Sequence, residues 1–296
     1  MHRVVITGYG VVSPIGYSAG EMMSSLAAGV CASKSMEGVW NHYGRLKCQV
    51  GAPVEMRDAK AIPRQQRRTM SPMSIYAVQA AIEAVGHAKL DPSQVGNNVR
   101  VGCVMGSTTG SPEASNKTYE TLLSKNEYEL LGASEFFRCI SHTVALNVSQ
   151  YYGIKGMVTS TNAACASGLQ AVGAAYDLVR LGRQDIVLAG GGEELHETSV
   201  GSFDILFAAS HKYNDSPSQT PRPFDKDRDG LVVGEGAGVM ILESYDHAVT
   251  RGAPMFAEIL GYHTCGNGTH VSQSDDASMT HCMKTALDEA KLKPET

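Results

Sequence analysis

A single cysteine, Cys165, stands where a stretch of small residues changes into a helical pattern. The preceding segment, "GMVTSTNAA", combines β-branched residues with turn formers, which predicts a strand followed by a tight turn. From Leu169 to Val179 apolar residues recur at helical spacing, and Gly182 is expected to end the helix. We therefore expect the Cys165 thiol at the N-terminus of a helix.

A thiol in that position is suited to nucleophilic chemistry. The positive end of the helix dipole favours a thiolate over a thiol, and the N–H groups of the first turn can stabilise an oxyanion. The neighbouring residues are small and leave room for a substrate: Ala163, Ala164, Ala166, Ser167 and Gly168. A buried structural cysteine is the alternative interpretation, and the residue type alone does not decide between the two.

Three further motifs carry weaker signals. "GYGVVSPIG" suggests a dinucleotide-binding loop, but Ser13 replaces the third glycine of that motif, which favours a structural turn. His263, Cys265 and His270 lack the spacing of a zinc site and are expected at a polar surface. In "RPFDKDRDG" the acidic residues alternate, but Gly236 occupies the position of the last calcium ligand, so a salt-bridged loop is expected. We expect no metal ion.

Short apolar runs alternate with helical patterns, which indicates a layered α/β fold. The runs that are typical of buried strands are Arg3–Gly8, Arg100–Gly106, Asp185–Gly192 and Gly236–Ser244. Because they are apolar throughout, they predict a central sheet that is covered on both faces. Helices are expected after Ser71, with Gly86 at the end, and from Ser274 to Ala290. The polar segment 106–126 is expected to be a functional loop.

The composition limits the class of protein. The chain has 296 residues, 43% of them hydrophobic and 19% charged, as expected for a folded globular protein. The net charge of −5 gives no reason to expect nucleic-acid binding. No apolar run is long enough to cross a membrane and the N-terminus lacks a signal-peptide pattern, so we expect a cytoplasmic protein without membrane contact. The seven cysteines are scattered, which indicates reduced thiols.

A small basic patch, "RQQRRTM", stands out in this acidic chain. It contains Arg64 and Arg68. A solvated entrance to a helix and a docking surface for an acidic partner are both compatible with the pattern.

Five ordered motifs resemble those of the β-ketoacyl-acyl-carrier-protein synthases, the decarboxylating condensing enzymes of fatty-acid and polyketide assembly. They are "VVITGYGVVSPIG", "NAACASG", "VLAGGGEE", "KYNDSP" and "RPFDKDRDGLVVGEGAG". The run from "GGGEELHE" to "KYNDSP" is most similar to bacterial synthase I. The resemblance implies an α/β fold, a thiolase-like layered α-β-α-β-α sandwich, of which this chain holds the N-terminal half and only the start of the second half. It assigns residues 1–254 to the first domain and 255–296 to the beginning of a truncated second domain.

The resemblance also implies roles for individual residues. Cys165 is expected to be the nucleophile that accepts an acyl group from the phosphopantetheine arm of acyl carrier protein, so no cofactor of its own is expected. Thr109 matches a position that controls the depth of the acyl pocket. Phe136 and Phe137 lie in a segment that reaches into the acyl pocket of a dimer partner. Arg64 and Arg68 fall where the family meets its acidic carrier.

One departure from the family pattern limits the expected activity. The two catalytic histidines of the family belong to motifs in its C-terminal half, and none of the ten histidines here takes such a place. We expect this chain alone to be incomplete for decarboxylative Claisen condensation with malonyl carrier protein. A homodimer is expected, formed through the strand beside the Cys165 helix, and a heterodimer is possible. The alternative function is a non-condensing subunit that binds carrier protein or complements a heteromeric synthase.

Overall fold

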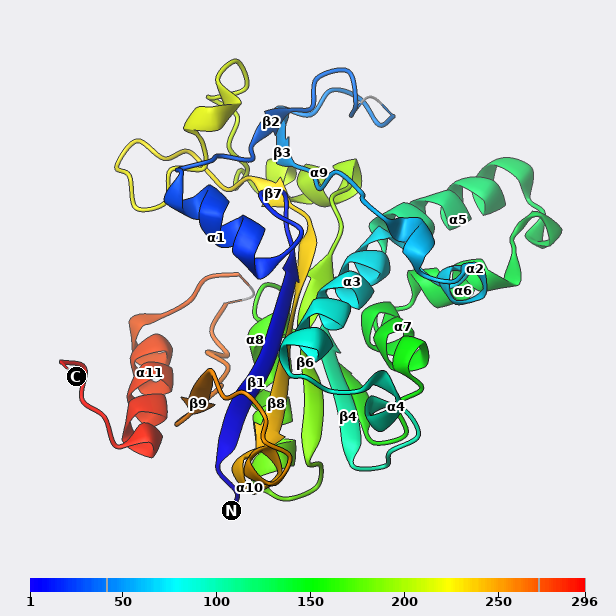
Figure 1. Cartoon of the computed structure of the whole chain (residues 1–296). Helices are drawn as coiled ribbons and strands as arrows, with labels where there is room; N and C mark the ends of the chain where they lie inside the picture. The colour runs from blue at the N-terminus through cyan, green and yellow to red at the C-terminus, as the bar shows by residue number, and fades with distance from the viewer. Residues whose placement is uncertain (41, 271, 296) are drawn as a thin grey trace.

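The computed structural model describes residues 1–40, 42–270 and 272–295, which form one large mixed sheet with helices on both faces (Figure 1). The strand order is β5-β4-β6-β8-β1-β9. The bounds are Val158–Thr161 (β5), Val101–Gly106 (β4), Ile186–Glu193 (β6), Gly236–Ser244 (β8), Val4–Val12 (β1) and Ala257–Ile259 (β9). The first three strands are parallel, whereas β8, β1 and β9 pair antiparallel with their neighbours. The four strands expected from the sequence are confirmed.

Both faces of the large sheet are buried, as the continuous apolar runs predicted. One face packs against α3 (Pro72–His87) and α7 (Thr143–Tyr152), and the other against α8 (Ser167–Arg180). Successive residues of β4 alternate between these cores, because side chains of a strand point to opposite faces. Cys103 and Met105 belong to the α3 and α7 side, and Val104 belongs to the α8 side.

A smaller layer covers the end of the large sheet at which β1 finishes and β8 begins. A three-stranded sheet is formed by β2 (Lys34–Ser35), β3 (Val50–Ala52) and β7 (Val233–Gly234). Helices α1 (Ala19–Ala27) and α9 (Glu197–Ile205) lie at the same end (Figure 1). The buried Trp40 and Val50 anchor this layer in a hydrophobic cluster of its own.

The segment 106–126, which we expected to be a loop, is a loop only at its start. Helix α5 (Pro112–Lys125) follows, because the Ser111 side chain accepts a hydrogen bond from the Ala114 N–H and Pro112 occupies the first turn. Both features favour a helix start, although the segment is too polar to show an apolar stripe. Other short helices before and after this segment are α2 (Arg64–Arg67), α4 (Pro92–Val95) and α6 (Ala133–Cys139).

The C-terminal segment returns to the face of the sheet that carries α8. Helix α10 (Tyr245–Thr250) leads through β9 to α11 (Asp276–Ala290), which confirms the last predicted helix. The Glu289 carboxylate of α11 accepts hydrogen bonds from the Tyr176 hydroxyl of α8 (3.3 Å) and the Tyr262 N–H (3.0 Å). These bonds hold α11 beside α8. Among the described residues, no helix is long and apolar enough to span a bilayer.

Candidate active site around Cys165

Cys165 lies in the tight turn between β5 and α8, as the sequence predicted. The preceding Ala164 has a φ of +48°, in the left-handed region that a residue with a Cβ seldom adopts. Helix α8 begins two residues after Cys165, and the thiol is free and exposed. The turn therefore presents the sulfur at the helix entrance instead of burying it, which argues against the structural-cysteine interpretation.

Ser167 holds this turn together. Its hydroxyl accepts a hydrogen bond from the Ala163 N–H (2.8 Å) and donates one to the Ala164 carbonyl oxygen (2.7 Å). Two N–H groups of the turn are also engaged, since Ala166 donates to Ala163 and Ser167 donates to Ala164, each over 3.0 Å. These two groups are therefore not free to bind an oxyanion.

The thiol opens into a cavity of about 1390 Å³. The cavity lies where β4 and β6 end and β8 begins, under α1, and its wall is mostly apolar. Among the apolar side chains are Met22 and Leu26 of α1 and Val239 and Met240 of β8. A space of this size and polarity fits an extended apolar ligand better than a charged one.

Three acidic side chains at the same end of the sheet were not recognised as site residues from the sequence. Glu193 and Glu235 line the cavity, and Glu194 is buried next to Glu193 in the chain. Burial raises the pKa of all three carboxyl groups, against hydrogen bonds that lower it. The motif "VLAGGGEE" contained the signal, because adjacent glutamates directly after a buried strand must lie at the edge of the core.

Each of these carboxylates accepts backbone N–H groups. Glu193 accepts from Thr108 (2.8 Å), and Glu235 accepts from Val54 (2.7 Å) and Leu195 (3.1 Å). They therefore join the loop after β4 and the small sheet to the ends of β6 and β8. This framework surrounds the cavity into which Cys165 opens.

Thr109 and Thr108 take different positions beside this cavity. Thr108 lines the cavity together with Ser107, whereas Thr109 is exposed and is not among the residues of its wall. The pocket-depth role of Thr109 stays a prediction. The neighbouring Ser107 side chain donates to the Ser141 carbonyl oxygen, which fixes the loop after β4 against the segment before α7.

Phe136 and Phe137 lie on α6 and are 67% and 42% exposed. Their rings contact each other edge to face, with centroids 5.4 Å apart. An exposed aromatic pair is compatible with burial by another chain, but the described residues do not test that role. β5, the strand before Cys165, lies at the edge of the large sheet, where the sequence placed the dimer contact; the homodimer also stays a prediction.

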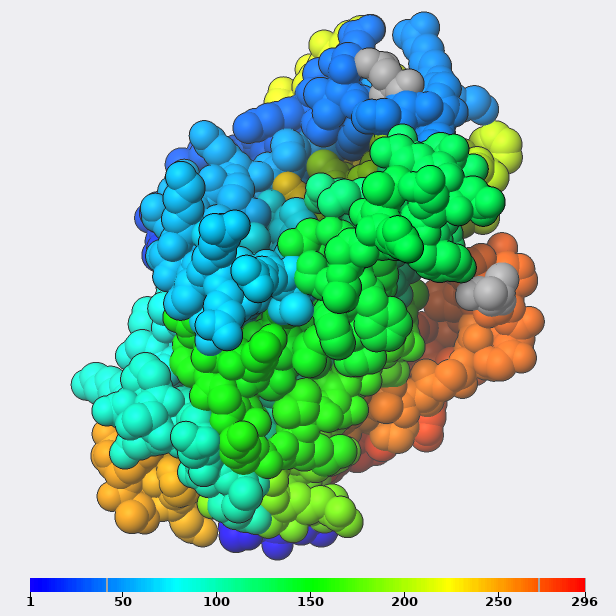
Figure 2. All heavy atoms as spheres, turned by 90° about the vertical axis from the view of Figure 1, so that its right-hand side faces the viewer, coloured from blue at the N-terminus to red at the C-terminus, as the bar shows by residue number. Residues whose placement is uncertain are grey.

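The basic patch lies beside α6, on the face that Figure 2 presents, where the segment around residue 65 meets the segment around residue 140. The Arg138 guanidinium of α6 donates to the Arg68 carbonyl oxygen (3.1 Å), which confirms that contact. Arg64 and Arg68 are exposed, whereas the Arg67 guanidinium donates to the Ile62 carbonyl oxygen (2.8 Å). Arg64 and Arg68 are therefore available to a partner, and Arg67 holds the local fold.

The other six cysteines range from buried to exposed. Cys48 and Cys103 are buried, and burial raises the pKa of Cys103 to about 12. Cys31 is exposed and lines the same cavity as Cys165, so it is the best internal comparison for the reactivity of the thiol.

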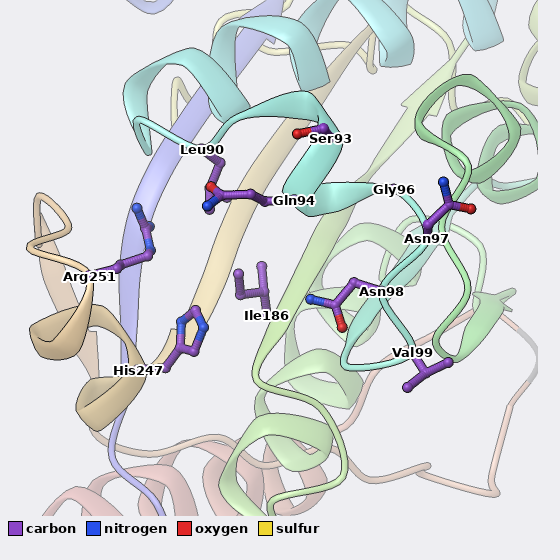
Figure 3. A pocket seen from close by; sticks show the side chains of 10 residues that line it. All are labelled: Leu90, Ser93, Gln94, Gly96, Asn97, Asn98, Val99, Ile186, His247 and Arg251. Atoms are coloured by element: carbon purple, nitrogen blue, oxygen red, sulfur yellow. The ribbon is translucent and has the colours of Figure 1, made fainter.

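A second cavity, of about 520 Å³, lies at the opposite end of the sheet, where β4 and β6 begin (Figure 3). His247 and Arg251 project toward it from α10 and the residue after that helix. Both pair with the fully buried Glu243, His247 over 2.5 Å and Arg251 through two bonds of 2.6 Å. Glu243 therefore holds both side chains in place, which gives them a structural role in the wall of this cavity.

The weaker motifs have structural roles. Ser13 and Gly16 exchange backbone hydrogen bonds, which confirms a structural turn. In the acidic loop, Asp225 pairs with Arg222 (2.9 Å), as expected of a salt-bridged loop. Among the described residues, no group of three or more histidine, cysteine or acidic side chains is arranged to hold a metal ion.

A sheet covered on both faces and an accessible thiol at a strand-to-helix turn define an α/β protein built around a candidate nucleophilic cysteine. Comparison with known proteins gives the family. The model described as "Beta-ketoacyl synthase, N-terminal domain" matches residues 1–248, and the chain belongs to this family. The resemblance stated from the sequence motifs is confirmed.

Individual relatives agree with this assignment. The chain is 33% identical to 3-oxoacyl-[acyl-carrier-protein] synthase 1 of Escherichia coli K12, over 97% of this chain and 70% of that protein. A β-ketoacyl synthase from Burkholderia phymatum superposes with a TM-score of 0.93 at 40% identity, covering 99% of this chain and 71% of the other. The ishigamide ketosynthase/chain length factor gives a TM-score of 0.89 at 27% identity, with the same two coverages. The thiolase-like fold predicted from the motifs is therefore correct.

Proposed function

We propose that Cys165 is the acyl-accepting nucleophile of a β-ketoacyl-acyl-carrier-protein synthase. Its sulfur attacks the carbonyl carbon of an acyl thioester, and the thiol of the carrier's phosphopantetheine arm leaves. The observation that carries this proposal is the exposed thiol at the entrance of α8, opening into an apolar cavity of about 1390 Å³ that can hold the acyl chain.

Two features of the turn support acyl transfer. The N–H of Cys165 is the proposed donor to the oxyanion, because the N–H groups of Ala166 and Ser167 are engaged within the turn. Gly168 adds access, since a Cβ built there would meet no heavy atom within 4 Å. A bulky acyl thioester can therefore approach the sulfur from that side.

The condensation step needs groups beyond these residues. In the proposed reaction a malonyl thioester loses CO2, and the resulting carbanion attacks the acyl group on Cys165. The catalytic histidines that the family uses for this step have no counterpart identified in residues 1–296. Loss of an electrostatic donor of that kind typically costs a factor of about 100 or more in rate. We therefore propose that these residues accept the acyl group but condense poorly alone.

The acyl donor in this proposal is an acyl carrier protein. The name of the Escherichia coli relative specifies this carrier, and the exposed cations Arg64 and Arg68 suit an acidic surface.

A second candidate function is a non-condensing subunit that complements a heteromeric synthase. The similarity to a solved ketosynthase/chain length factor favours it. The two candidates differ at Cys165, because only the first requires a covalent acyl-cysteine.

The decisive experiment measures acyl loading. The chain is incubated with an acyl carrier protein thioester and, separately, with the same acyl group on pantetheine. The mass of the peptide that contains Cys165 is then measured by mass spectrometry. We expect an acyl adduct on Cys165 from both donors and none in Cys165→Ser. In a variant that combines Arg64→Glu with Arg68→Glu, loading from the carrier should fall roughly tenfold while loading from pantetheine is unchanged.

Alkylation provides an independent readout of the nucleophile. We expect iodoacetamide to modify Cys165 faster than Cys31, which lines the same cavity. Equal rates at these two thiols, together with no acyl adduct from either donor, would refute the nucleophile and favour the non-condensing subunit.

A further inference from the structure

Two cysteines that take no part in the proposed reaction lie against each other near the C-terminus. The Cys265 thiol, in the segment after β9, donates to the carbonyl oxygen of Ser278 in the first turn of α11 (3.5 Å). The Cys282 thiol, on α11, donates to the carbonyl oxygen of His263 (3.3 Å). Each thiol thus contacts the backbone of the segment that carries the other.

Helix geometry brings the two sulfur atoms to the same place. Ser278 lies four residues before Cys282, so it occupies the preceding turn on the same face of α11. Side chains of a helix lean toward its N-terminus, which directs the Cys282 sulfur over the turn that Cys265 contacts. Their proximity has a chemical effect, since desolvation and then the Cys282 thiol raise the pKa of Cys265.

Neighbouring contacts keep the two segments in register. The rings of His263 and His281 meet edge to face with centroids 5.2 Å apart. The Tyr262 N–H donates to Glu289 (3.0 Å), two turns beyond Cys282. The thiol pair therefore belongs to a packed contact between two elements. Cys265 is exposed, so an external reagent can reach the pair.

We propose that Cys265 and Cys282 are a reversible disulfide site that is oxidised by low-molecular-weight disulfides such as glutathione disulfide. The thiolate of Cys265 attacks one sulfur of the oxidant and expels one thiol, which leaves a mixed disulfide on Cys265. The Cys282 thiolate then attacks the Cys265 sulfur and expels the second thiol. Two protein thiols become one disulfide, and the oxidant is reduced to two thiols.

The bond would connect α11 covalently to the segment that packs against α8. Thr264 accepts a hydrogen bond from the Gln170 side-chain amide of α8 (3.2 Å), one position before Cys265. Tyr262 packs so closely on Gly173 of α8 that a Cβ there would lie 1.9 Å from its ring. Oxidation would therefore brace α8, the helix that begins beside Cys165, through residues that take no part in acyl transfer.

The test titrates the intact chain with glutathione disulfide, blocks the remaining thiols with N-ethylmaleimide and maps the products by mass spectrometry. Trypsin leaves both cysteines on the peptide Gly252–Lys284, and a protease that cuts before Asp275 divides this peptide between them. We expect the two halves to stay joined until a reductant is added. In wild-type chain, little glutathione should remain on Cys265.

The variant Cys282→Ser separates the two chemical steps. Without the second thiol the mixed disulfide cannot resolve, so we expect about tenfold more glutathione on Cys265 than in the wild type, because the intramolecular attack outruns a second bimolecular one. Cys31→Ser is the matched control and should leave the joined peptides unchanged. Equal glutathione on Cys265 in wild type and Cys282→Ser, or halves that separate without reductant, would overturn the proposal. The joined halves are measured on wild-type chain, so this readout decides the proposal even where Cys282→Ser folds poorly.

Discussion

The buried Glu194 carboxyl group should make the stability of this chain depend on pH. Glu194 is 2% exposed and lies between the N-terminal ends of α3 and α5. It accepts hydrogen bonds from the Ser111 hydroxyl (2.5 Å), the Glu113 N–H (3.1 Å) and the Met73 N–H (3.4 Å). Burial nevertheless outweighs these donors and raises its pKa from 4.5 to about 7.

The direction of the effect follows from proton binding. Because the folded chain holds a proton on Glu194 more tightly than the unfolded chain does, this group contributes its full stability below pH 4.5. The contribution is lost as the pH rises through about 7. A pKa difference of 1 between the folded and the unfolded chain corresponds to about 1.4 kcal/mol of unfolding free energy. With a pKa of about 7 in the folded chain and 4.5 in the unfolded chain, Glu194 should lower the free energy of unfolding by about 3 kcal/mol at pH 8.

Glu194→Gln imitates the protonated side chain at every pH. Rearranged hydrogen bonds should cost the variant about 1 kcal/mol. We therefore expect it to be about 1 kcal/mol less stable than the wild type near pH 4.5 and about 2 kcal/mol more stable at pH 8. Burial raises the pKa values of Glu193 and Glu235 as well. Their contributions cancel when the unfolding free energy of Glu194→Gln is subtracted from that of the wild type at the same pH.

Urea unfolding from pH 4.5 to 8 measures this difference. The chain has one tryptophan, Trp40, which is 5% exposed, so its fluorescence reports the folded state. The exposed Glu37 supplies the control for exchanging a glutamate for a glutamine, and Glu37→Gln should change the stability by less than about 0.5 kcal/mol. A stability difference between wild type and Glu194→Gln that is constant over the whole range would refute the reasoning, since it would show that Glu194 titrates alike in the folded and unfolded chain.

Three further substitutions test the packing and the second cavity. In Gly8→Ala the new Cβ would lie 2.1 Å from the Ala84 carbonyl oxygen, so we expect a loss of about 1–3 kcal/mol in urea unfolding. Gly86 lies on α3, the helix that contains Ala84. A Cβ added at Gly86 would meet no heavy atom within 4 Å, so Gly86→Ala should be neutral or slightly stabilising. Arg251→Met leaves the buried Glu243 without its bidentate partner, and thermal unfolding should show a loss of about 3–5 kcal/mol. A loss below 1 kcal/mol would mean that His247 alone satisfies Glu243.

Much of the fold could be predicted because its signals are local. Apolar runs identified the strands that flank the site, and the change from small residues to helical spacing located the turn at Cys165. Helix α5 was missed because it lacks an apolar stripe, and its start depends on the capping contact between Ser111 and Ala114. Capping depends on backbone geometry, which residue types indicate only in part.

Other parts of the site depend on how the backbone turns between neighbouring segments, which residue types alone do not specify. The sequence does not distinguish Arg67 from Arg64 and Arg68. The structure does, because the Arg67 guanidinium donates to the Ile62 carbonyl oxygen. The proximity of Cys265 and Cys282 arises in the same way, since it requires the segment after β9 to run back along α11. The sequence spacing between Cys265, in a loop, and Cys282, on a helix, does not predict by itself that the two thiols meet.

The small residues around Cys165 have two roles: some permit close packing of the backbone, and others leave space for a substrate. The pattern of small residues indicates room for a substrate, but the glycines within it have different roles. A Cβ at Gly106, the last residue of β4, would lie 2.5 Å from the Ser167 backbone, so this glycine lets the strand touch the start of α8. Gly168 meets nothing within 4 Å and supplies the open side. The thiol is held in place on one side and approachable on the other, which is the arrangement that a nucleophile requires.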